Sequence, residues 1–512
     1  MKLAESGWRL AILLAILAVG AALRLWGAFY DLPYVYHPDE PPNIDSIQSM
    51  IINGDANPHD FRYPSLMYDV DAMAGWIYYA VRSLSTGIRE QPGPLLSIAM
   101  GSTFAPSSDA VALFRTLSIG AGVLSILLTY LVGRRALGPP AAIGAAALVA
   151  LSPVLIAESR FVTPDSFVVV FTLVTILCAF RVAQRGDVFA YVAAGAAVGA
   201  TAAAKYNGAL VCIAVIAAHV LRFGVAPSQW WRLLLAGATS IVAFVVFMPY
   251  AILDFSGFMA GWTSQVGIYG DRHPGMEGNA LGWYLDELWT TSGIAVVLAA
   301  IELARRWRMG DRHVIVIASF ALVYLGFIGT FNLRNDRTLL PVVPCVALLA
   351  ASLFAYLMTE ASVLQRVSRP LRSLAIGVVA AALLVVPLRQ TVARTQNLIR
   401  LDSRTTAREW INTQLPEHSR IAVESYSPFV DPARFEIYQA ESAIDRKPAW
   451  YVENGIDYVV LSQGLFGRFF LEPKRYPGQV ARYAELMDSF TLVRRFDDGG
   501  YTVLVYRTRA KP

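Results

Sequence analysis

The stretch Tyr36-His37-Pro38-Asp39-Glu40 places two adjacent acidic residues soon after an apolar segment, residues 10–23. That segment belongs to a predicted membrane span over residues 9–29. Carboxylates placed beside a membrane are costly and are usually functional. The stretch therefore predicts a membrane protein with a polar site near the membrane surface. Arg24-Leu25-Trp26 interrupts the small residues that a signal-peptide cleavage site needs, so we expect the first span to stay uncleaved. A cleaved leader is the alternative.

The composition of the chain agrees with this prediction. Of the 512 residues, 55% are hydrophobic and 16% are charged, and the mean hydropathy is +0.47. A soluble protein usually has about 25% charged residues. The net charge of +5 is spread over short loops, which excludes the basic face of a nucleic-acid-binding protein. We expect an integral membrane protein with many spans, membrane lipids around it and no nucleic-acid partner.

Apolar segments near the roughly 20 residues that cross a bilayer recur along the chain. They are residues 9–29, 109–132, 140–158, 164–183, 188–204, 208–223, 233–253, 290–305, 314–331, 338–359 and 373–390. Segment 65–83 is amphipathic and carries Asp69 and Asp71, so we expect it to lie along the membrane surface. The pattern predicts a polytopic α-helical membrane protein of about 11 transmembrane helices.

Lysine and arginine are concentrated in one set of the short loops, for example at Arg134-Arg135 and Arg305-Arg306. Because cytoplasmic loops are enriched in these residues, we assign this set to the cytoplasm. Residues 30–108, residues 254–289 and the tail from about residue 391 then lie outside. We therefore expect a transmembrane domain over residues 1–390 and an extracytoplasmic domain over residues 391–512.

The tail is charged and contains no further span. Residues 403–414 are typical of an amphipathic helix that ends before Pro416. Segments 420–424 and 457–462 are typical of strands, and so are 490–496 and 501–507, which Asp498-Gly499-Gly500 separates. These signals predict a small soluble α/β domain.

Charged residues far apart in the sequence fall at the outer ends of the predicted spans. They are Arg24, Asp39, Glu40, Arg160, Asp165, Lys205, Arg334 and Arg337. We expect them to gather in one cavity that opens to the outer surface. A transporter is instead expected to place polar groups near the bilayer midplane. The pattern favours an enzyme that acts at the outer interface, with a transporter or flippase, or a non-catalytic scaffold for the tail, as alternatives.

The acidic pair has a chemical and a structural interpretation. Asp39 could take a proton from a hydroxyl group as a general base, with Glu40 orienting it or stabilising the donor. Alternatively, Asp39 only caps a short helix before Ile44.

The other outer residues also have two interpretations. Arg160 could bind a phosphate, and Asp165 could pair with Arg160 or assist acceptor binding. Alternatively, this segment only starts a helix, with Thr163 as its cap and Asp165 interacting favourably with the helix dipole. Lys205 could bind an anionic partner, or its side chain could simply extend to the lipid headgroups. Arg334 and Arg337 are spaced to grip a phosphate, unless Asp336 neutralises one of them.

Histidines are the candidate metal ligands. His37, His59 and His273 all fall in predicted outer segments, and with Asp39 they could hold a divalent metal. They have no fixed ligand spacing, so the sequence predicts no metal site or cofactor.

Together these residues make the chain resemble the GT-C membrane glycosyltransferases, in particular the family of protein O-mannosyltransferases and of the aminoarabinose transferase of lipid A. The matching motifs are Arg24-Leu25-Trp26, Asp39-Glu40, Arg62-Tyr63-Pro64, Arg160 with Asp165, Lys205-Tyr206, Arg337-Thr338-Leu339-Leu340-Pro341 and Ala407-Arg408-Glu409-Trp410-Ile411. Trp230-Trp231-Arg232 loosely resembles an oligosaccharyltransferase motif, but it lies on the predicted cytoplasmic side and lacks the acid.

The resemblance implies a bacterial plasma-membrane enzyme whose donor is a sugar on a polyprenyl phosphate and whose acceptor is a hydroxyl group of a protein, a lipid or the cell wall. It implies an inverting transfer in which Asp39 is the base, with Glu40 and Asp165 assisting. It also implies that Lys205, Arg160, Arg337, Arg334 and Tyr206 bind the donor phosphate, and that Arg62, Tyr63 and His37 face the acceptor.

Overall fold

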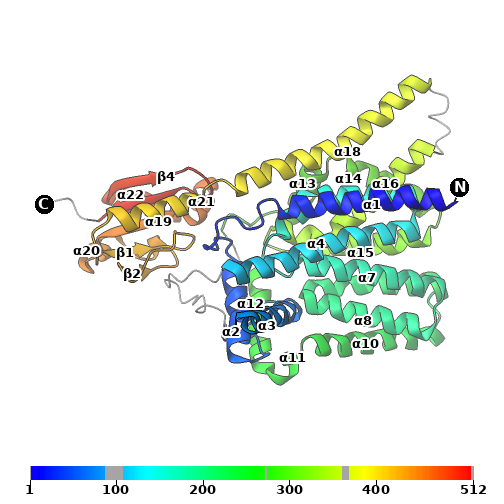
Figure 1. The fold of residues 1–512 in the computed structure, drawn as a ribbon, viewed down its shortest axis with the longest axis horizontal. Helices are drawn as coiled ribbons and strands as arrows, with labels where there is room; N and C mark the ends of the chain where they lie inside the picture. The colour runs from blue at the N-terminus through cyan, green and yellow to red at the C-terminus, as the bar shows by residue number, and fades with distance from the viewer. Residues whose placement is uncertain (1, 87–107, 271–273, 360–367, 509–512) are drawn as a thin grey trace.

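The computed structural model describes residues 2–86, 108–270, 274–359 and 368–508. Most elements in these ranges are α-helices, and the described strands form one sheet near the C-terminus. Figure 1 shows the long helices running side by side, with the sheet domain beyond one end of the bundle and the N-terminus at the other end. The predicted fold class, a helical membrane protein with a C-terminal α/β domain, is confirmed.

The bundle is built from helices that run between its two ends. They are α1 (Lys2–Leu25), α4 (Ser108–Ala136), α5 (Pro139–Leu151), α7 (Asp165–Gln184), α8 (Val188–Ala204), α9 (Cys212–Phe223), α10 (Trp231–Phe247), α14 (Ile294–Arg308), α15 (Arg312–Ile328), α16 (Val343–Thr359) and α18 (Arg369–Leu398). Seven helical segments of the described residues are long and apolar enough to cross a membrane, or up to eight if α13 (Ala280–Ser292) and α14 form one bent span. Three shorter apolar helices, α5, α8 and α15, add to these. Each of the eleven predicted spans overlaps one of the bundle helices, in keeping with a multi-pass membrane protein.

Three predicted spans are interrupted, and these boundaries were wrong. Span 233–253 leaves the helix at Met248, between α10 and α11 (Tyr250–Leu253). Span 140–158 is divided at Ser152 into α5 and α6 (Pro153–Glu158), because a proline has no N–H to continue the hydrogen-bond ladder. Span 290–305 crosses a bend of 110° at Gly293, whose φ of 55° is easily adopted only by glycine. The last span also extends beyond its predicted end, since α18 continues to Leu398.

Shorter elements lie at the end of the bundle that faces the tail. They are α2 (Glu40–Asn53), α3 (Leu66–Thr86), η1 (Tyr206–Val211), α11 (Tyr250–Leu253), α12 (Phe255–Gly270) and η3 (Asp336–Val342), while η2 (Pro227–Gln229) precedes α10. Figure 1 shows α3 almost end-on while the bundle helices run across the view. The helix predicted over 65–83 is therefore present and crosses the bundle direction. Residues 87–107 of the predicted outer segment lie outside the described residues.

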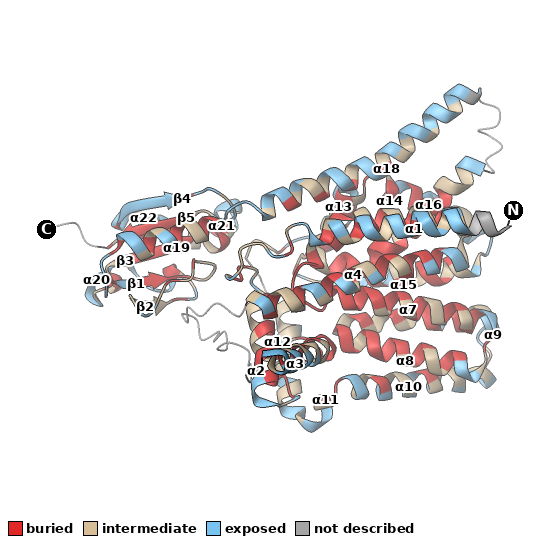
Figure 2. Cartoon of the chain, viewed as in Figure 1, coloured by how far each residue is buried: buried red, intermediate tan, exposed pale blue. Residues whose placement is uncertain are grey.

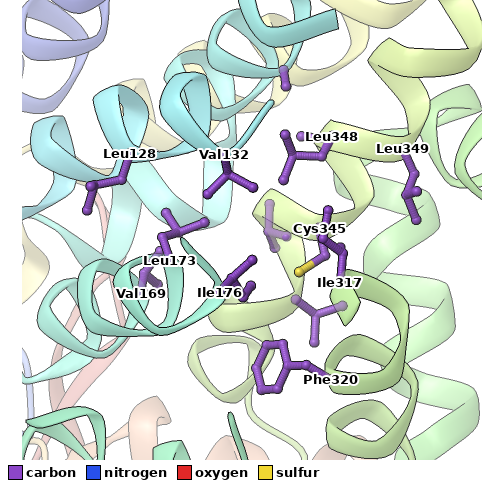
Figure 3. Packing of buried hydrophobic residues seen from close by; sticks show 14 of the residues in the cluster. Leu128, Val132, Val169, Leu173, Ile176, Ile317, Phe320, Cys345, Leu348 and Leu349 are labelled. Atoms are coloured by element: carbon purple, nitrogen blue, oxygen red, sulfur yellow. The ribbon is translucent and has the colours of Figure 1, made fainter. Parts of the chain in front are cut away.

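The core of the bundle is a continuous apolar cluster, drawn as the red inner faces of the helices in Figure 2. Figure 3 shows its centre, where Leu128 and Val132 of α4 meet Leu173 of α7 and Leu348 of α16. Helices α8 and α10 pack more closely still. A Cβ atom on Gly199 would lie 2.3 Å from the carbonyl oxygen of Ser240, so glycine is required there. Small residues thus let the backbones of these two helices approach each other closely.

The tail forms a five-stranded sheet covered by helices. Its elements are α19 (Ser403–Gln414), β1 (Arg420–Val423), β2 (Glu436–Gln439), η4 (Ala443–Asp445), α20 (Pro448–Glu453), β3 (Tyr458–Ser462), α21 (Gln463–Leu471), α22 (Pro477–Ser489), β4 (Thr491–Phe496) and β5 (Val503–Arg507). The strand order is β2-β1-β3-β5-β4, with β1 parallel to β2 and β3, and β5 antiparallel to β3 and β4. The predicted helix and four predicted strands are present, whereas β2 and the other tail helices were not predicted. We call residues 403–508 the tail domain.

Candidate functional site

The acidic pair divides into two residues with different surroundings. Glu40, the first residue of α2, forms an ion pair with Arg115 of α4, and both side chains are 0% exposed. Arg115 Nε and Nη2 donate to the two carboxylate oxygens at 2.8 Å each, and the Val162 N–H donates to Glu40 Oε1 at 3.0 Å. Glu40 thus joins the segment before α2, α4 and the loop before α7. All these contacts are internal, and Glu40 lines neither cavity described below.

Asp39 is turned toward a cavity instead. Its side chain is 32% exposed, and one of its carboxylate oxygens accepts a hydrogen bond from Arg337 Nη1 of η3. Burial alone would raise the pKa of Asp39, but the charge of Arg337 and the hydrogen bond that it donates hold the pKa below its ordinary value. Asp39 is therefore ionised at neutral pH. It stands before α2 at the helix-cap position but makes no side-chain cap hydrogen bond, so its side chain is left for other partners.

A polar cavity of about 370 Å³ surrounds the Asp39 carboxylate. Its walls come from the loop before α2 and the start of α2, the loop before α3, the C-terminal end of α6, α12 with the segment after it, and the start of η3 with the loop before it. The tail domain supplies a further wall. The lining residues used below are His37, Asp39, Asn43, Arg62, Tyr63, Glu158, Gln265, Tyr269, Asp336, Arg337, Tyr426, Arg468 and Tyr501.

An apolar cavity of about 500 Å³ adjoins the polar one. Tyr63, Gln265 and Tyr269 line both cavities and so form their common wall. Trp262 of α12, Phe331, Lys205 and Tyr206 line the apolar cavity but not the polar one. An apolar groove that meets a charged pocket suits a molecule with a hydrocarbon part and a polar head.

Lys205 brings a buried cation to the apolar cavity. It follows the last residue of α8, and its Nζ donates to Asp165 Oδ1 at 2.6 Å. Asp165 Oδ2 is buried without a hydrogen-bond partner among the described residues. The neighbouring Tyr206 donates its hydroxyl proton to the Phe61 carbonyl oxygen at 2.9 Å and packs edge-on against Trp262. Asp165 therefore holds Lys205 in place, rather than pairing with Arg160 as the sequence suggested.

The segment around Arg62 also reaches the polar cavity. Arg62 lines it while forming an ion pair with Asp60, with Nη2 and Oδ2 2.5 Å apart. The His37 ring stacks on Phe161, with the ring centres 3.9 Å apart. Burial lowers the pKa of His37, so its ring is neutral at pH 7. Three of the residues expected to face the acceptor, His37, Arg62 and Tyr63, thus lie beside Asp39.

Two predicted phosphate ligands lie elsewhere. Arg160 is 1% exposed, and its Nη2 donates to the Leu23 carbonyl oxygen at 2.6 Å and to Thr395 Oγ1 at 2.8 Å, so it ties α1 to α18. Arg334 stands 3.7 Å from Glu472 of the tail domain. Neither residue lines either cavity. Asp336 pairs with Arg394 and leaves Arg337 to Asp39.

The predicted histidines do not gather at one point. His59 forms an exposed ion pair with Asp55, whereas His37 lines the polar cavity. His273 lies outside the described residues. Within the described ranges no group of three or more His, Cys, Asp or Glu residues is arranged to hold a metal ion.

Several residues of the site were not foreseen. Arg115 could have been noticed, because a lone arginine within a predicted span needs a buried partner. Glu158 was quoted only as a neighbour of Arg160. Tyr269 and the tail residues Tyr426, Arg468 and Tyr501 carry no local signal, since only the packing of distant segments brings them to the cavity.

A family model described as dolichyl-phosphate-mannose-protein mannosyltransferase matches residues 96–253 of the chain. The matched part contains Asp165 and Lys205 but not Asp39. The sequence matches no curated protein.

Solved structures of two membrane enzymes resemble the whole chain. The apo oligosaccharyltransferase of Archaeoglobus fulgidus has 12% identity and a TM-score of 0.59, with 98% of this chain and 74% of that one covered. The same organism's AglB, in complex with an inhibitory peptide and a dolichol-phosphate, has 12% identity and a TM-score of 0.58 over 99% of this chain and 74% of that one. ArnT from Cupriavidus metallidurans, bound to undecaprenyl phosphate, has 15% identity and a TM-score of 0.57 over 99% and 98% of the two chains. The chain therefore has the fold of the GT-C glycosyltransferases, and the fold that the resemblance implied is confirmed.

Proposed function

We propose that this chain is an inverting glycosyltransferase that moves a sugar from a polyprenyl-phosphate donor to a hydroxyl acceptor at the outer face of a bacterial plasma membrane. The observation that carries this proposal is the common wall of the two cavities, formed by Tyr63, Gln265 and Tyr269. The apolar cavity suits the polyprenyl chain, and the polar cavity suits the sugar and the acceptor. In this orientation the tail domain is extracytoplasmic.

The chemical step needs one base and a place for negative charge. Asp39 is ionised, so it can accept the proton of the acceptor hydroxyl. The freed oxygen attacks the anomeric carbon and forms the new C–O bond while the bond from that carbon to the phosphate oxygen breaks. The polyprenyl phosphate leaves with the bonding electron pair. Because the attack comes from the face opposite the phosphate, the anomeric configuration is inverted.

Two cations are placed to stabilise the leaving phosphate. Lys205 lines the apolar cavity and is near enough for its charge to act on Asp39, and Arg337 is paired with Asp39. Fixed cations in a site with little water act strongly on charge that develops in the transition state. Tyr206 supports this region through its contact with Trp262. Glu40 and Arg160, which have internal partners, are assigned to holding the site together rather than to touching the donor.

The comparisons support a lipid-linked donor. One similar enzyme was solved with undecaprenyl phosphate and another with a dolichol-phosphate and a peptide. The tail-domain wall of the polar cavity is the surface we assign to the acceptor, which is a protein, a lipid or a cell-wall polymer. Transfer needs no metal in this proposal.

The test compares the wild type with Asp39→Asn. Purified full-length protein is given undecaprenyl-phosphate-linked sugars and a membrane extract as the acceptor source, and the release of undecaprenyl phosphate is measured. We expect release by the wild type and a loss of at least about 100-fold in Asp39→Asn, the usual contribution of a general base. Asp55→Asn, whose carboxylate pairs with the exposed His59, is the matched control and should act like the wild type.

Equal release by Asp39→Asn and the wild type would overturn the assignment of the base. If the wild type carries donor lipid across a vesicle membrane without transferring its sugar, the transporter or flippase hypothesis replaces the transferase.

A further inference from the structure

The polar cavity contains a buried carboxylate to which the proposed mechanism gives no task. Glu158 is the last residue of α6, is 7% exposed and lines the cavity that surrounds Asp39. Its Oε2 atom is shielded from solvent and receives no hydrogen bond from the described residues. Burial and the charges of three neighbouring carboxylates raise the pKa of Glu158 well above its ordinary value, so its carboxyl group is protonated at neutral pH and stands at the cavity wall without a hydrogen-bond partner at Oε2.

The other acids near Glu158 differ from it in this respect. Asp39 is paired with Arg337, Asp165 with Lys205, and Asp336 with Arg394. These three carboxylates disfavour the ionised form of Glu158, and Arg337, which pairs with Asp39, is the cation that favours it. Among these four acids, Glu158 is the one that forms no ion pair with a described residue.

Leaving a buried carboxyl group without hydrogen-bond partners costs free energy, so a ligand that supplies them gains affinity at this point. A protonated carboxyl group donates one hydrogen bond from its O–H and accepts hydrogen bonds on its oxygens. The polyprenyl chain can do neither, and the phosphate is assigned to Lys205 and Arg337. A sugar hydroxyl group both donates and accepts, so the sugar is the part of the donor that fits.

We propose that Glu158 receives hydrogen bonds from hydroxyl groups of the donor sugar and thereby helps to select which sugar enters the polar cavity. This inference rests on the proposed glycosyltransferase function. It makes Glu158 a sugar-binding residue with no part in the proton transfer at Asp39.

The test measures binding, not turnover. Full-length protein in lipid nanodiscs is titrated with undecaprenyl phosphate alone, with undecaprenyl-phosphate hexose and with undecaprenyl-phosphate pentose. The quantity compared is the ratio of the affinity for a sugar-bearing lipid to the affinity for the bare lipid. A change in the surroundings of the phosphate affects all three probes alike, so this ratio isolates the sugar.

In the wild type we expect one sugar-bearing lipid to bind more tightly than the bare lipid. In Glu158→Leu the ratio should fall about tenfold or more, the effect of losing the hydrogen bonds to the sugar. Glu436→Leu, which alters an exposed glutamate of β2, is the matched control and should keep the wild-type ratio. Since Glu158 Oε2 has no bond to lose, the melting temperature of Glu158→Leu should not fall below that of the wild type. If that variant fails to fold, Glu158→Ala takes its place with the same expected fall.

The outcomes separate this inference from the proposed function. A wild-type ratio retained in Glu158→Leu overturns the inference, and so does equal binding of all three probes by the wild type, which leaves a lipid-phosphate site in place. If the wild type binds none of the three lipids, the proposed function itself fails and the inference fails with it.

Discussion

Glu40→Gln is expected to destabilise the protein, whereas Asp39→Asn, one residue earlier, is expected to stop turnover and leave stability nearly unchanged. Glu40 and Arg115 are both 0% exposed and are joined by two hydrogen bonds of 2.8 Å. Glutamine keeps the shape of Glu40 but leaves the charge of Arg115 buried without a counter-ion. Asp39 sits at a cavity, where solvent can replace its partner.

The magnitudes follow from these surroundings. Removal of one partner of a buried ion pair costs about 3–5 kcal/mol of unfolding free energy. Arg115 also donates to the Ala28 carbonyl oxygen at 2.9 Å, which offsets part of the loss, so we expect a value near 3 kcal/mol for Glu40→Gln. The more exposed pair of Asp39 with Arg337 is expected to contribute about 1 kcal/mol or less.

The assay is equilibrium unfolding of the purified protein in mixed micelles of increasing SDS content, with donor turnover measured on the same samples. The double variant Glu40→Leu/Arg115→Met should recover much of the lost stability, because no unpaired charge remains in the interior. If Glu40→Gln unfolds like the wild type, the pair does not hold the site together. If Asp39→Asn is the less stable variant, the division of roles between the two acids is wrong.

Three further predictions concern the cavities. Arg337→Gln should raise the pKa of Asp39, because the charge that opposes the effect of burial is removed. Turnover needs the ionised carboxylate and is lost below this pKa, so the acid limb of the pH–rate profile should move to higher pH. An acid limb that stays in place would contradict this. Lys205→Ala should weaken binding of undecaprenyl phosphate about tenfold or more. Adding Asp165→Asn to this variant should restore the melting temperature but not the lipid affinity. If Lys205→Ala binds the lipid as tightly as the wild type, Lys205 is not part of the donor site. Arg468→Gln should raise the KM for the acceptor roughly tenfold and leave the affinity for undecaprenyl phosphate unchanged. An unchanged KM with a weaker affinity for undecaprenyl phosphate would instead assign the tail-domain wall of the polar cavity to the donor.

Elements with strong local patterns could be predicted from the sequence. The helix over Ser403–Gln414 has the predicted bounds because Asp402 caps it and Pro416 follows it. The apolar spans were also found, since length and hydropathy suffice for them. Breaks within spans were missed, because Pro153 and Gly293 are tolerated in many membrane helices and only packing decides whether they divide one. Strand β2 is short and partly exposed, so it has no apolar alternation to reveal it.

The composition of the site could be predicted only in part. Asp39, Lys205 and Arg337 reach the cavities because charges at the outer ends of spans need a polar surrounding. Arg160 looked equivalent to them, but an arginine has five donors and can satisfy them on carbonyl oxygens of a neighbouring helix as well as on a phosphate. The contribution of Arg468 depends on how the tail domain docks, and no local pattern encodes that.

A structure of the full-length protein in nanodiscs with undecaprenyl phosphate bound tests the central claim most directly. We predict that the polyprenyl chain lies in the apolar cavity against Trp262 and Phe331, with its phosphate beside Lys205 at the wall shared with the Asp39 cavity. A phosphate bound at the opposite end of the bundle, or a lipid chain that leaves the apolar cavity empty, would contradict it.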